Sequence, residues 1–522
     1  MGLIYKTDKR TTIPRWRSHD LALEVGELSP LQMGASSVSL DFRHGALIEQ
    51  IFAWNKYRTI PHAADLFSSA YAMGIENDFL DIATFLYKEK DNISKVLLRQ
   101  VTEVLGISKD ELLLDVNFDF FTEEGKKRTI SEISRIRHYL KKEPNNPLAW
   151  VDLARNHSLL GNIDKSIMAI ETALHVNDTS DRFVLRSASR LFHHLGDDER
   201  AHSIIRKGQN IKFDPWLISS EIAYSSILNR RSGLIKNAKE IIKGKKFSPF
   251  QISELASAVG TTEFFEGDFK NAKSMFNTAL IQPNDNSLAQ VIWFHEYFPY
   301  LLELSAEQIN IPLAFEAQTH LYYNSGDYKS ACKSAIRWLN DEPYSTRPVR
   351  LASYISTIFL GNNSQSIEIL KHGLKANRTD LKLLNSLCYN LLLEDDISEA
   401  EKYLGKYKNS VITSEPVETK IAIVATTGLY NFRIGNIDEG RKSYLESIEF
   451  AIKQKSDYLQ ALAVANYLRE EIIVYKKGNI KRDKLIIISL VDKLKGLTIK
   501  ARQSDVLRLS TNVLREYDAI DR

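Results

Sequence analysis

A helix-breaking glycine recurs down the chain, each time between two segments with the apolar spacing of a helix. In residues 146–178, Leu153, Leu160 and Ile167 recur at helical spacing, and Gly161 separates the two halves. Glycine ends a helix there at low steric cost, because it adopts left-handed backbone freely. Two short helices joined by such a turn cannot bury their apolar sides alone. The segment therefore predicts one unit of a stacked helical array.

The same turn residue between two helical segments recurs along most of the chain. The turn glycines are Gly161, Gly196, Gly267, Gly326, Gly361 and Gly435, and Asp395 takes the same place in one further unit. A degenerate unit with Gly233 as its turn is expected between Gly196 and Gly267. An ordinary helical bundle has no reason to keep its turns in phase, so the pattern favours a repeat.

The unit at 146–178 resembles a tetratricopeptide repeat. Trp150, Leu153 and Ala154 match the opening of the pattern, and Leu160-Gly161-Asn162 matches its turn. The resemblance covers roughly residues 145–451. It implies an all-α fold, a right-handed superhelical solenoid of helix–turn–helix repeats with helical end caps.

Four parts are expected along the chain. They are a basic, partly extended N-terminal arm at 1–45, a divergent helical region at 46–144, the solenoid at 145–451 and C-terminal capping helices at 452–522. The interval between Gly267 and Gly326 exceeds one repeat, so an inserted aromatic helical segment or a divergent repeat is expected at 284–311.

The arm is basic and lacks apolar periodicity. Its cations are Lys6, Lys9, Arg10, Arg15 and Arg17. It is either a solvated, flexible tail or an extended strand docked on the solenoid. In both cases its cations could contact an acidic partner or nucleic acid.

Composition limits the function classes. A chain of 522 residues exceeds one ordinary core, which suits an elongated array. Lys+Arg 69 against Asp+Glu 66 argues against wholesale polyanion binding. The two cysteines, Cys332 and Cys388, exclude a disulfide framework and favour a reducing, cytosolic compartment. The apolar run at 287–304 contains His295, Glu296 and Pro299, so no membrane span is predicted.

Catalytic motifs are missing from the sequence. It contains no phosphate-binding glycine loop, no H-E-x-x-H and no G-x-S-x-G. The adjacent pair His193-His194 cannot face one metal from a helix. We therefore expect no metal, no cofactor and no enzymatic activity, although a cryptic enzyme with its site in residues 1–145 stays open.

In tetratricopeptide arrays the first helix of each unit lines a concave groove, and the resemblance implies which side chains reach it here. The groove candidates are Arg155, Ser158, Arg186, Arg190, His193, Thr261, Phe264, Glu316, His320, Tyr323, Asn385, Tyr389, Leu429 and Phe432. Guanidinium groups bind carboxylates in a bidentate manner, so the early arginines suggest an acidic peptide. Val151 stands where the chaperone-binding clamp would place a lysine, so chaperone tails are not expected.

The leading prediction is a non-enzymatic protein-interaction scaffold or regulatory adaptor subunit that binds a protein or acidic peptide in the groove. The alternative is a helical-repeat nucleic-acid binder that uses the arm and a basic groove. The groove positions change character between units, which does not suit a code of one base per repeat. The sequence does not indicate an oligomeric state.

Overall fold

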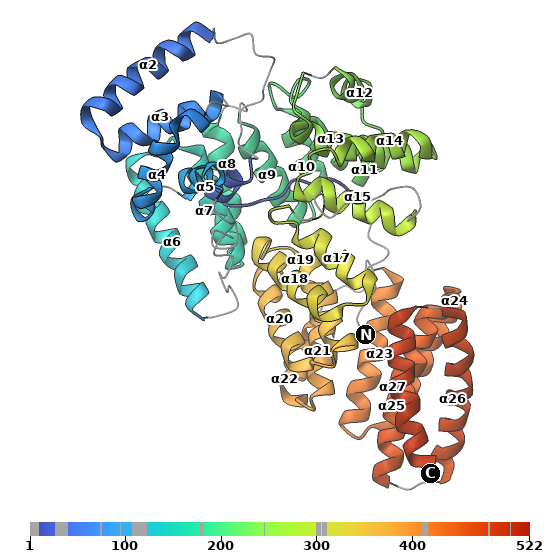
Figure 1. Ribbon diagram of the computed structural model, residues 1–522. Helices are drawn as coiled ribbons and strands as arrows, with labels where there is room; N and C mark the ends of the chain where they lie inside the picture. Colours follow the sequence, from blue (N-terminus) through green and yellow to red (C-terminus); the bar gives the residue numbers. More distant parts are fainter. Residues whose placement is uncertain are drawn as a thin grey trace.

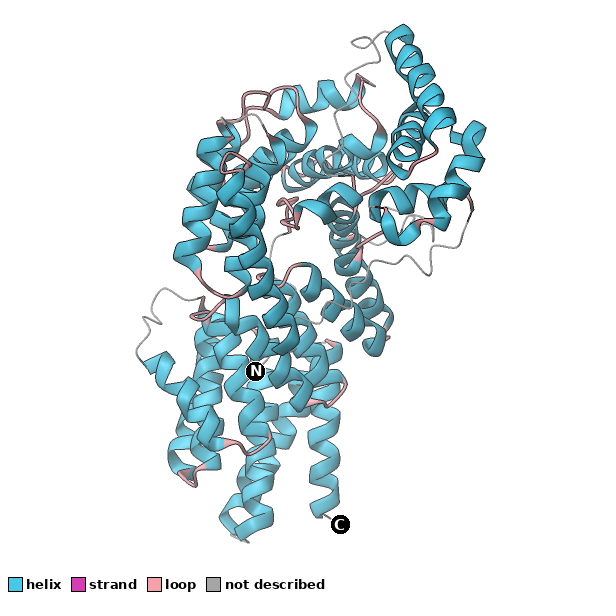
Figure 2. Cartoon of the chain, turned by 90° about the vertical axis from the view of Figure 1, so that its left-hand side faces the viewer, coloured by secondary structure: helices cyan, strands magenta, loops and turns pink. Residues whose placement is uncertain are grey.

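The computed structural model describes residues 10–26, 40–73, 76–93, 95–106, 123–177, 181–244, 246–298, 304, 309, 311–408, 416–478, 481–501 and 503–521. Within these ranges the backbone forms helices joined by turns and contains no strand (Figure 2). The all-α prediction is confirmed. The first arm residues, 1–9, lie outside the described part of the chain.

From residue 147 onward the helices follow one another as antiparallel pairs (Figure 1). The first helices are α7 (Pro147–Leu159), α9 (Arg182–His194), α11 (Pro215–Ile227), α13 (Pro249–Phe265), α15 (Asp285–Tyr297), α17 (Phe315–Ser325), α19 (Thr346–Tyr354), α21 (Leu381–Leu393), α23 (Val417–Arg433) and α25 (Asp457–Gly478). The second helices are α8 (Ile163–Val176), α10 (Asp198–Arg206), α12 (Ile235–Lys243), α14 (Phe269–Ala279), α18 (Tyr328–Asp341), α20 (Asn363–Ala376), α22 (Ile397–Lys408), α24 (Ile437–Lys453) and α26 (Lys481–Ala501). A π-helical turn, η4 (Ile355–Phe359), extends α19.

The predicted turns have the backbone that their residues favour. Gly161, Gly196 and Gly326 have φ values of 68°, 80° and 82°, and Asp395 takes φ 57° in the unit without a turn glycine. Asn229, with φ 53°, makes the corresponding turn between α11 and α12. The sequence prediction of Gly233 at this place was therefore wrong. Asparagine tolerates left-handed backbone better than most residues with a side chain, which explains the exchange.

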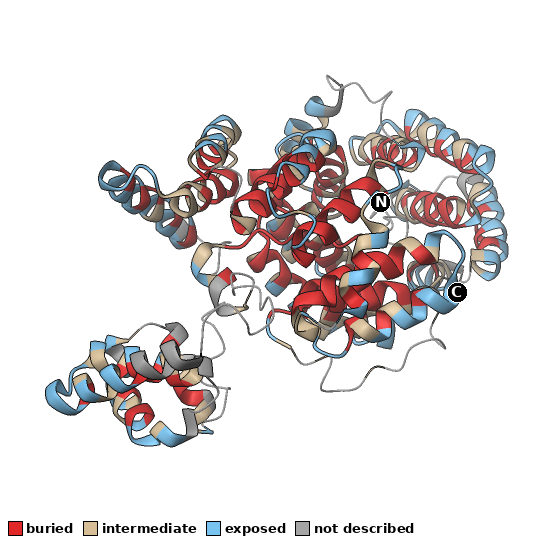
Figure 3. Ribbon diagram, turned by 90° about the horizontal axis from the view of Figure 1, so that it is seen from above, coloured by how far each residue is buried: buried red, intermediate tan, exposed pale blue. Residues whose placement is uncertain are grey.

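The apolar core runs along the array as successive clusters, which is typical of a solenoid. One cluster joins α6 (Glu123–Lys142) to α11, the next joins α11 to α17, and a third joins α18 to the last helix, α27 (Ser504–Asp521). Figure 3 shows buried residues on the sides where helices face one another and exposed residues on the outer sides. Cys332 and Cys388 are both buried, and no disulfide joins them.

The aromatic segment predicted as an insertion begins as a regular member of the array. Its first part is α15, which packs against α13 before it and α17 after it, as a first helix does. Trp293 and Phe294 are buried in the core that these helices share. Most of the segment beyond 298 lies outside the described residues.

The N-terminal helices form a small group with a core of its own (Figures 1 and 3). The group contains α2 (Leu40–Tyr57), α3 (Ile60–Met73), η1 (Glu76–Phe79), α4 (Leu80–Lys88), η2 (Lys90–Asn92) and α5 (Lys95–Val104). Helix α2 begins at Leu40, inside the range expected to be arm. At the other end, α27 folds back onto η4, and the hydroxyls of Tyr354 and Tyr458 both donate to Asp505.

The array curves until its later helices meet its first unit. Helix α20 packs against α7, and the Arg378 guanidinium donates to the Leu160 carbonyl at 3.3 Å. Nearby, the His194 ring lies 5.6 Å from the Tyr344 ring, centroid to centroid. We call this contact between the two turns of the superhelix the seam. It encloses the concave side between α7 and α20, so what lies there is surrounded by protein.

The seam makes a specific demand on Gly161. A Cβ atom added to Gly161 would lie 2.2 Å from the Lys375 carbonyl, whereas one added to Gly196 would meet nothing within 4 Å. Both glycines are left-handed, so alanine strains each backbone by about 1–2 kcal/mol. We expect Gly161→Ala to lower the free energy of unfolding by at least about 1 kcal/mol more than Gly196→Ala, because only the former overpacks the seam. Urea denaturation measures both, and equal losses would mean that the seam is not closed.

The seam is also expected to respond to acid through His194. Burial, then the nearby Arg190 charge, lowers the pKa of His194 to about 3, against about 6.5 in an unfolded chain. Between pH 6.5 and 3, His194 is protonated in the unfolded chain but not in the folded one. The contribution of His194 to stability is therefore fully present above pH 6.5 and is lost progressively as the pH falls towards 3.

Thermal melts between pH 7.5 and 5 test this dependence. We expect His194→Gln, which keeps a hydrogen-bond donor but does not titrate, to lose about 1–2 kcal/mol less stability over this range than the unaltered protein. Other histidines titrate in both proteins, so the difference reports His194. Parallel pH curves would contradict the assignment.

Candidate functional site

The concave side of the array holds the N-terminal arm. Residues 10–17 run without helix or strand, followed by the short helix α1 (His19–Glu24). Figure 1 shows this dark blue segment crossing the solenoid from α7 towards α15. Trp16 and Arg17 are 0% exposed, and the three arginines of the segment are all buried. A solvated tail, one of the two sequence expectations, is thereby excluded for residues 10–17.

Arg10 fits an acidic and amide-lined position between α15 and α17. Its Nε and Nη2 donate to the two carboxylate oxygens of Glu316 at 3.0 and 2.9 Å. Its Nη1 donates to Gln290 at 2.7 Å, and Nη2 also reaches Asn286 at 2.9 Å. Glu316 accepts in addition from Arg15 at 2.6 Å, so one carboxylate joins two arm residues.

The other two arginines bridge three further carboxylates. Arg15 donates to Asp285 at 2.9 Å and to Glu342 at 2.8 Å. Arg17 donates to Asp341 with Nε and Nη2, at 2.9 and 2.7 Å, and to Asp285 with Nη2 at 2.7 Å. Bidentate guanidinium–carboxylate pairs of this kind fix orientation as well as charge.

The solenoid also hydrogen-bonds the arm backbone. The carbonyls of Arg10, Ile13 and Trp16 accept, in that order, from Gln290 at 3.0 Å, from Asn286 at 3.0 Å, and from both Arg155 and Tyr344 at 3.2 Å. The His19 amide donates to Asp152 at 2.9 Å, where the arm enters α1. Burial raises the pKa of Asp152 to about 6, and this hydrogen bond opposes the rise.

Four buried carboxylates face the arm, Asp285, Glu316, Asp341 and Glu342, and we call the space that they line the channel. Pairing with guanidinium groups lowers the pKa of Asp285, Glu316 and Glu342 and keeps these three ionised. Burial alone would raise the pKa of Glu316, but the guanidinium groups of Arg10, Arg347 and Arg15 hold it well below its usual value. Burial is likewise outweighed at Asp285, whose pKa is lowered by Arg17 and Arg15. Charge is therefore compensated pair by pair, as burial of so many ions requires.

The arginines predicted to line the groove are there, but their charges are already engaged. Arg186 donates to Glu254 at 2.9 Å. Arg190 lies over the Tyr344 ring at 4.9 Å, with its Nη2 3.8 Å from Glu342. Arg155 donates to the arm, and Ser158 is buried beside it in α7. These arginines contact the arm and buried carboxylates of the array.

The predicted histidines are engaged in the same way. His193 Nδ1 lies 2.5 Å from Asp198, and His320 Nδ1 lies 3.0 Å from Glu296. Among the described residues no group of three or more histidine, cysteine or acidic side chains is placed to hold a metal ion. The described helices include none that is long and apolar enough to cross a membrane.

Most of the predicted aromatic candidates pack into the core. Phe264 contacts Phe294 edge to face at 5.2 Å, and Tyr323 contacts Phe359 in the same manner at 5.6 Å. Phe432 lies 5.9 Å from the Tyr444 ring. The remaining candidates are also hydrogen-bonded or buried. The Tyr389 hydroxyl donates to Asn466, and Thr261, Asn385 and Leu429 are buried.

Glu316 was among the predicted groove residues, but the rest of the acidic side was not predicted. Asp285, Asn286 and Gln290 fall within the segment expected as an aromatic insertion, and Asp341 and Glu342 were not singled out. The arm arginines gave one signal, because guanidinium groups that become buried require carboxylate partners. The register could not be read, because Arg10 and Glu316 are 306 positions apart. The arm arginines that could have touched nucleic acid are buried against these carboxylates.

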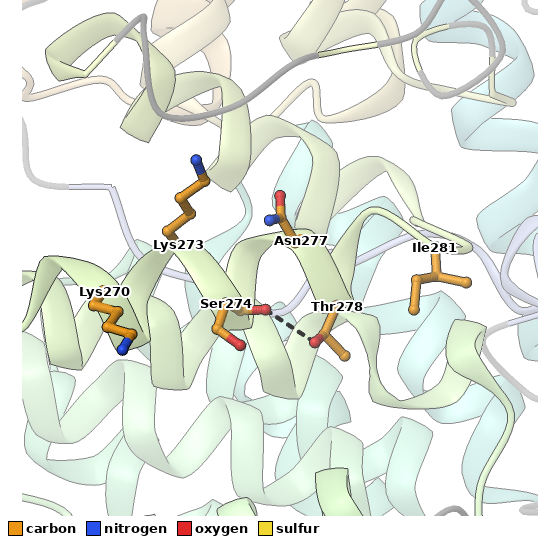
Figure 4. A pocket seen from close by; sticks show the side chains of 6 residues that line it. All are labelled: Lys270, Lys273, Ser274, Asn277, Thr278 and Ile281. Carbon is orange, nitrogen blue, oxygen red and sulfur yellow. Dashed lines mark hydrogen bonds between the residues drawn. The ribbon is translucent and has the colours of Figure 1, made fainter.

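A second hollow lies on the outer side of the array. It is a shallow, open depression along α14 (Figure 4), lined by Lys270, Lys273, Ser274, Asn277, Thr278 and Ile281. Its one marked hydrogen bond is local, from the Thr278 hydroxyl to the Ser274 carbonyl. Nothing in it converges as the side chains of the concave channel do.

The stacked helix pairs, with left-handed turns between them, form a helix–turn–helix repeat array, the architecture expected from the resemblance to tetratricopeptide repeats. No family model and no curated protein match the chain. Among solved structures, the APC/C hetero-tetramer Cut9-Hcn1 is similar over 91% of this chain and 97% of that one, with 11% identity and a TM-score of 0.38. Yeast Tom70 is similar over 79% of this chain and 97% of its own, with 12% identity and a TM-score of 0.29. The human IFIT1 dimer with PPP-AAAA is similar over 95% of this chain and 99% of the IFIT1 chain, with 10% identity and a TM-score of 0.31.

The ion-pair network makes Arg15 the arm residue whose loss should cost most. We expect Arg15→Ala to lower the free energy of unfolding by about 3–5 kcal/mol, because it leaves buried carboxylates without their partner. Arg128→Ala, which removes an exposed i,i+4 pair with Glu124, should cost at most about 1 kcal/mol. Chemical denaturation compares the two variants. A loss at Arg15 as small as that at Arg128 would show that the arm does not occupy the channel in solution.

Proposed function

We propose that the chain is a non-enzymatic protein-interaction scaffold that binds an extended segment of a partner along the concave side of its helix pairs. The supporting observation is the arm itself. The inner side chains of the array already hold extended polypeptide there, through its backbone carbonyls and through its charged side chains. A surface that recognises backbone at several points is suited to peptide in general.

The electrostatics of the channel support a binding role over a catalytic one. A general base needs a pKa near the working pH, so that it can take up and release a proton. Guanidinium groups hold the pKa of Glu316 and of Glu342 below their usual values, the latter mainly through Arg15 and then Arg190. Such carboxylates are weak bases and strong anchors for cations.

Arg155 is the predicted groove residue with the clearest part in this function. It reaches the Trp16 carbonyl and also the Asp341 carbonyl, so it ties bound peptide to the turn after α18. We propose that Arg155 donates to a partner's backbone in the same way. Among the other predicted groove residues, Arg186 and Arg190 compensate the charge of buried carboxylates beside the channel.

Capture followed by direct binding tests this function. The full chain, immobilised and exposed to an extract of its own cells, should retain one protein in stoichiometric amount. The purified partner should then bind the full chain in a calorimeter. Arg155→Ala should weaken that binding by about tenfold, because it removes a charged hydrogen-bond donor.

The matched control is Arg200→Ala, which removes a guanidinium that pairs with Glu171 on the outer surface. It should leave the affinity unchanged. The function as proposed is wrong if no protein partner is retained, or if a partner binds equally well to both variants.

A further inference from the structure

We infer that the arm is an intramolecular ligand, and that the channel it fills is a site for an arginine-rich extended segment of another protein. The inference rests on the proposed function and names the chemistry of the partner. The arm of the chain itself and the segment of the partner would occupy the same site, so the arm also controls access to that site. The reasons lie in the charge, the spacing and the quality of the fit.

The charge of the channel selects cations. Asp285, Glu316, Asp341 and Glu342 are each 5% exposed or less, and each accepts from at least one arm guanidinium. Emptying the channel would leave these carboxylates facing one another with few counter-charges. A peptide that enters must therefore bring several cations with it, and an acidic or nucleic-acid ligand would be repelled.

The spacing selects arginine in particular. Arg10, Arg15 and Arg17 each donate to two or more side chains, with a planar fork of donors. The ammonium group of lysine is a point charge and cannot reproduce such paired contacts. The site therefore recognises segments that carry arginine at relative positions 1, 6 and 8.

The backbone contacts define the conformation of the ligand. The channel contacts the carbonyls of Arg10, Ile13 and Trp16 and then the amide of His19, at intervals of three residues. Polyproline II has three residues per turn, so every third carbonyl of such a segment points the same way. Pro14 favours this conformation within the arm. These backbone contacts do not depend on the side chains of the ligand and are available to a partner.

The arm is not an ideal occupant. The Thr11 hydroxyl and the Trp16 indole Nε1 are buried, and no hydrogen-bond partner for either is present in the described part of the chain. A buried donor without a partner weakens binding. A segment with valine at the Thr11 position would keep the shape and lose the penalty. Another protein's segment can therefore bind this channel more tightly than the arm does.

Exchange requires the superhelix to open. The arm lies on the concave side that the seam encloses, where Arg378 reaches Leu160 and α20 packs against α7. A competing segment must wait for that opening, so binding to the unaltered chain should be slow. If the arm leaves the channel open in about 1% of molecules, the apparent affinity for a competitor falls about 100-fold.

A labelled peptide with the sequence of residues 9–19 tests the inference by fluorescence anisotropy. The recipient is the full chain carrying Arg10→Gln, Arg15→Gln and Arg17→Gln, whose own arm has lost its cations. We expect this variant to bind the peptide at least about 100-fold more tightly than the unaltered chain does. The full chain with Arg128→Gln and Arg200→Gln, two exposed arginines that pair with Glu124 and Glu171, is the control and should behave as unaltered.

Two altered peptides test the chemistry that is read. Replacing all three arginines by lysine should weaken binding to the recipient by at least about tenfold. Replacing Thr11 by valine should strengthen it severalfold, because the buried hydroxyl is removed. Equal binding of the arginine and lysine peptides would overturn the specificity. A recipient that keeps its helical circular dichroism and cooperative melting but binds no peptide would overturn the inference itself.

Hydrogen exchange on the unaltered full chain keeps the inference testable if the recipient does not fold. Amides of residues 10–19 should exchange through an opening that needs less free energy than global unfolding. Exchange of the arm only with the whole array would mean that it is a fixed part of the core, and the inference would fail. The proposed function is judged apart from this, because a partner captured through Arg155 could lack arginines altogether.

Discussion

The concave side of this array is organised around the contact of Glu316 with the arm. One buried carboxylate accepts from Arg10 and Arg15, and Arg347 of α19 lies 2.9 Å from it as well. Ion pairs are a costly way to fill space, since apolar side chains of similar size stabilise a core equally well or better. What ion pairs add is register: only a segment with cations at the right positions satisfies every carboxylate. The arm is therefore placed to within one residue along the channel.

Closure of the superhelix and occupation of the channel depend on each other. Trp16 belongs to the same buried cluster as residues of α6 to α11, and it contacts the Tyr344 ring at 5.1 Å. Tyr344 also contacts His194, which lies at the seam. The arm thus forms part of the packing that brings the later units against the first one. Without it the seam would have to close over unpaired carboxylates, which buried charge does not permit.

The sequence was sufficient for what is local and insufficient for what is distant. The turn glycines, the apolar spacing and the small residue Ala154 predicted the helix pairs because neighbours within one unit determine them. The repeat also predicted groove positions, and one of these residues, Arg155, donates to the arm. Of the acidic half only Glu316 followed, because Asp285 and Glu342 look like ordinary helix-end carboxylates until the arm is placed beside them. No rule of local pattern joins residues some 300 positions apart.

The arm precedes, along the chain, the helices that enclose it, and this order has a consequence for biogenesis. Ribosomes release residues 10–17 long before the acidic residues that bind them, and at about 5–20 residues per second the interval is roughly 15–60 s. During that time the arginines are free to meet chaperones or other acidic surfaces. The helices can then fold around an arm that is already present, so the arm never has to be threaded through a superhelix whose seam has closed. A circularly permuted chain with the arm at its far end would lose that advantage, although its native contacts were identical.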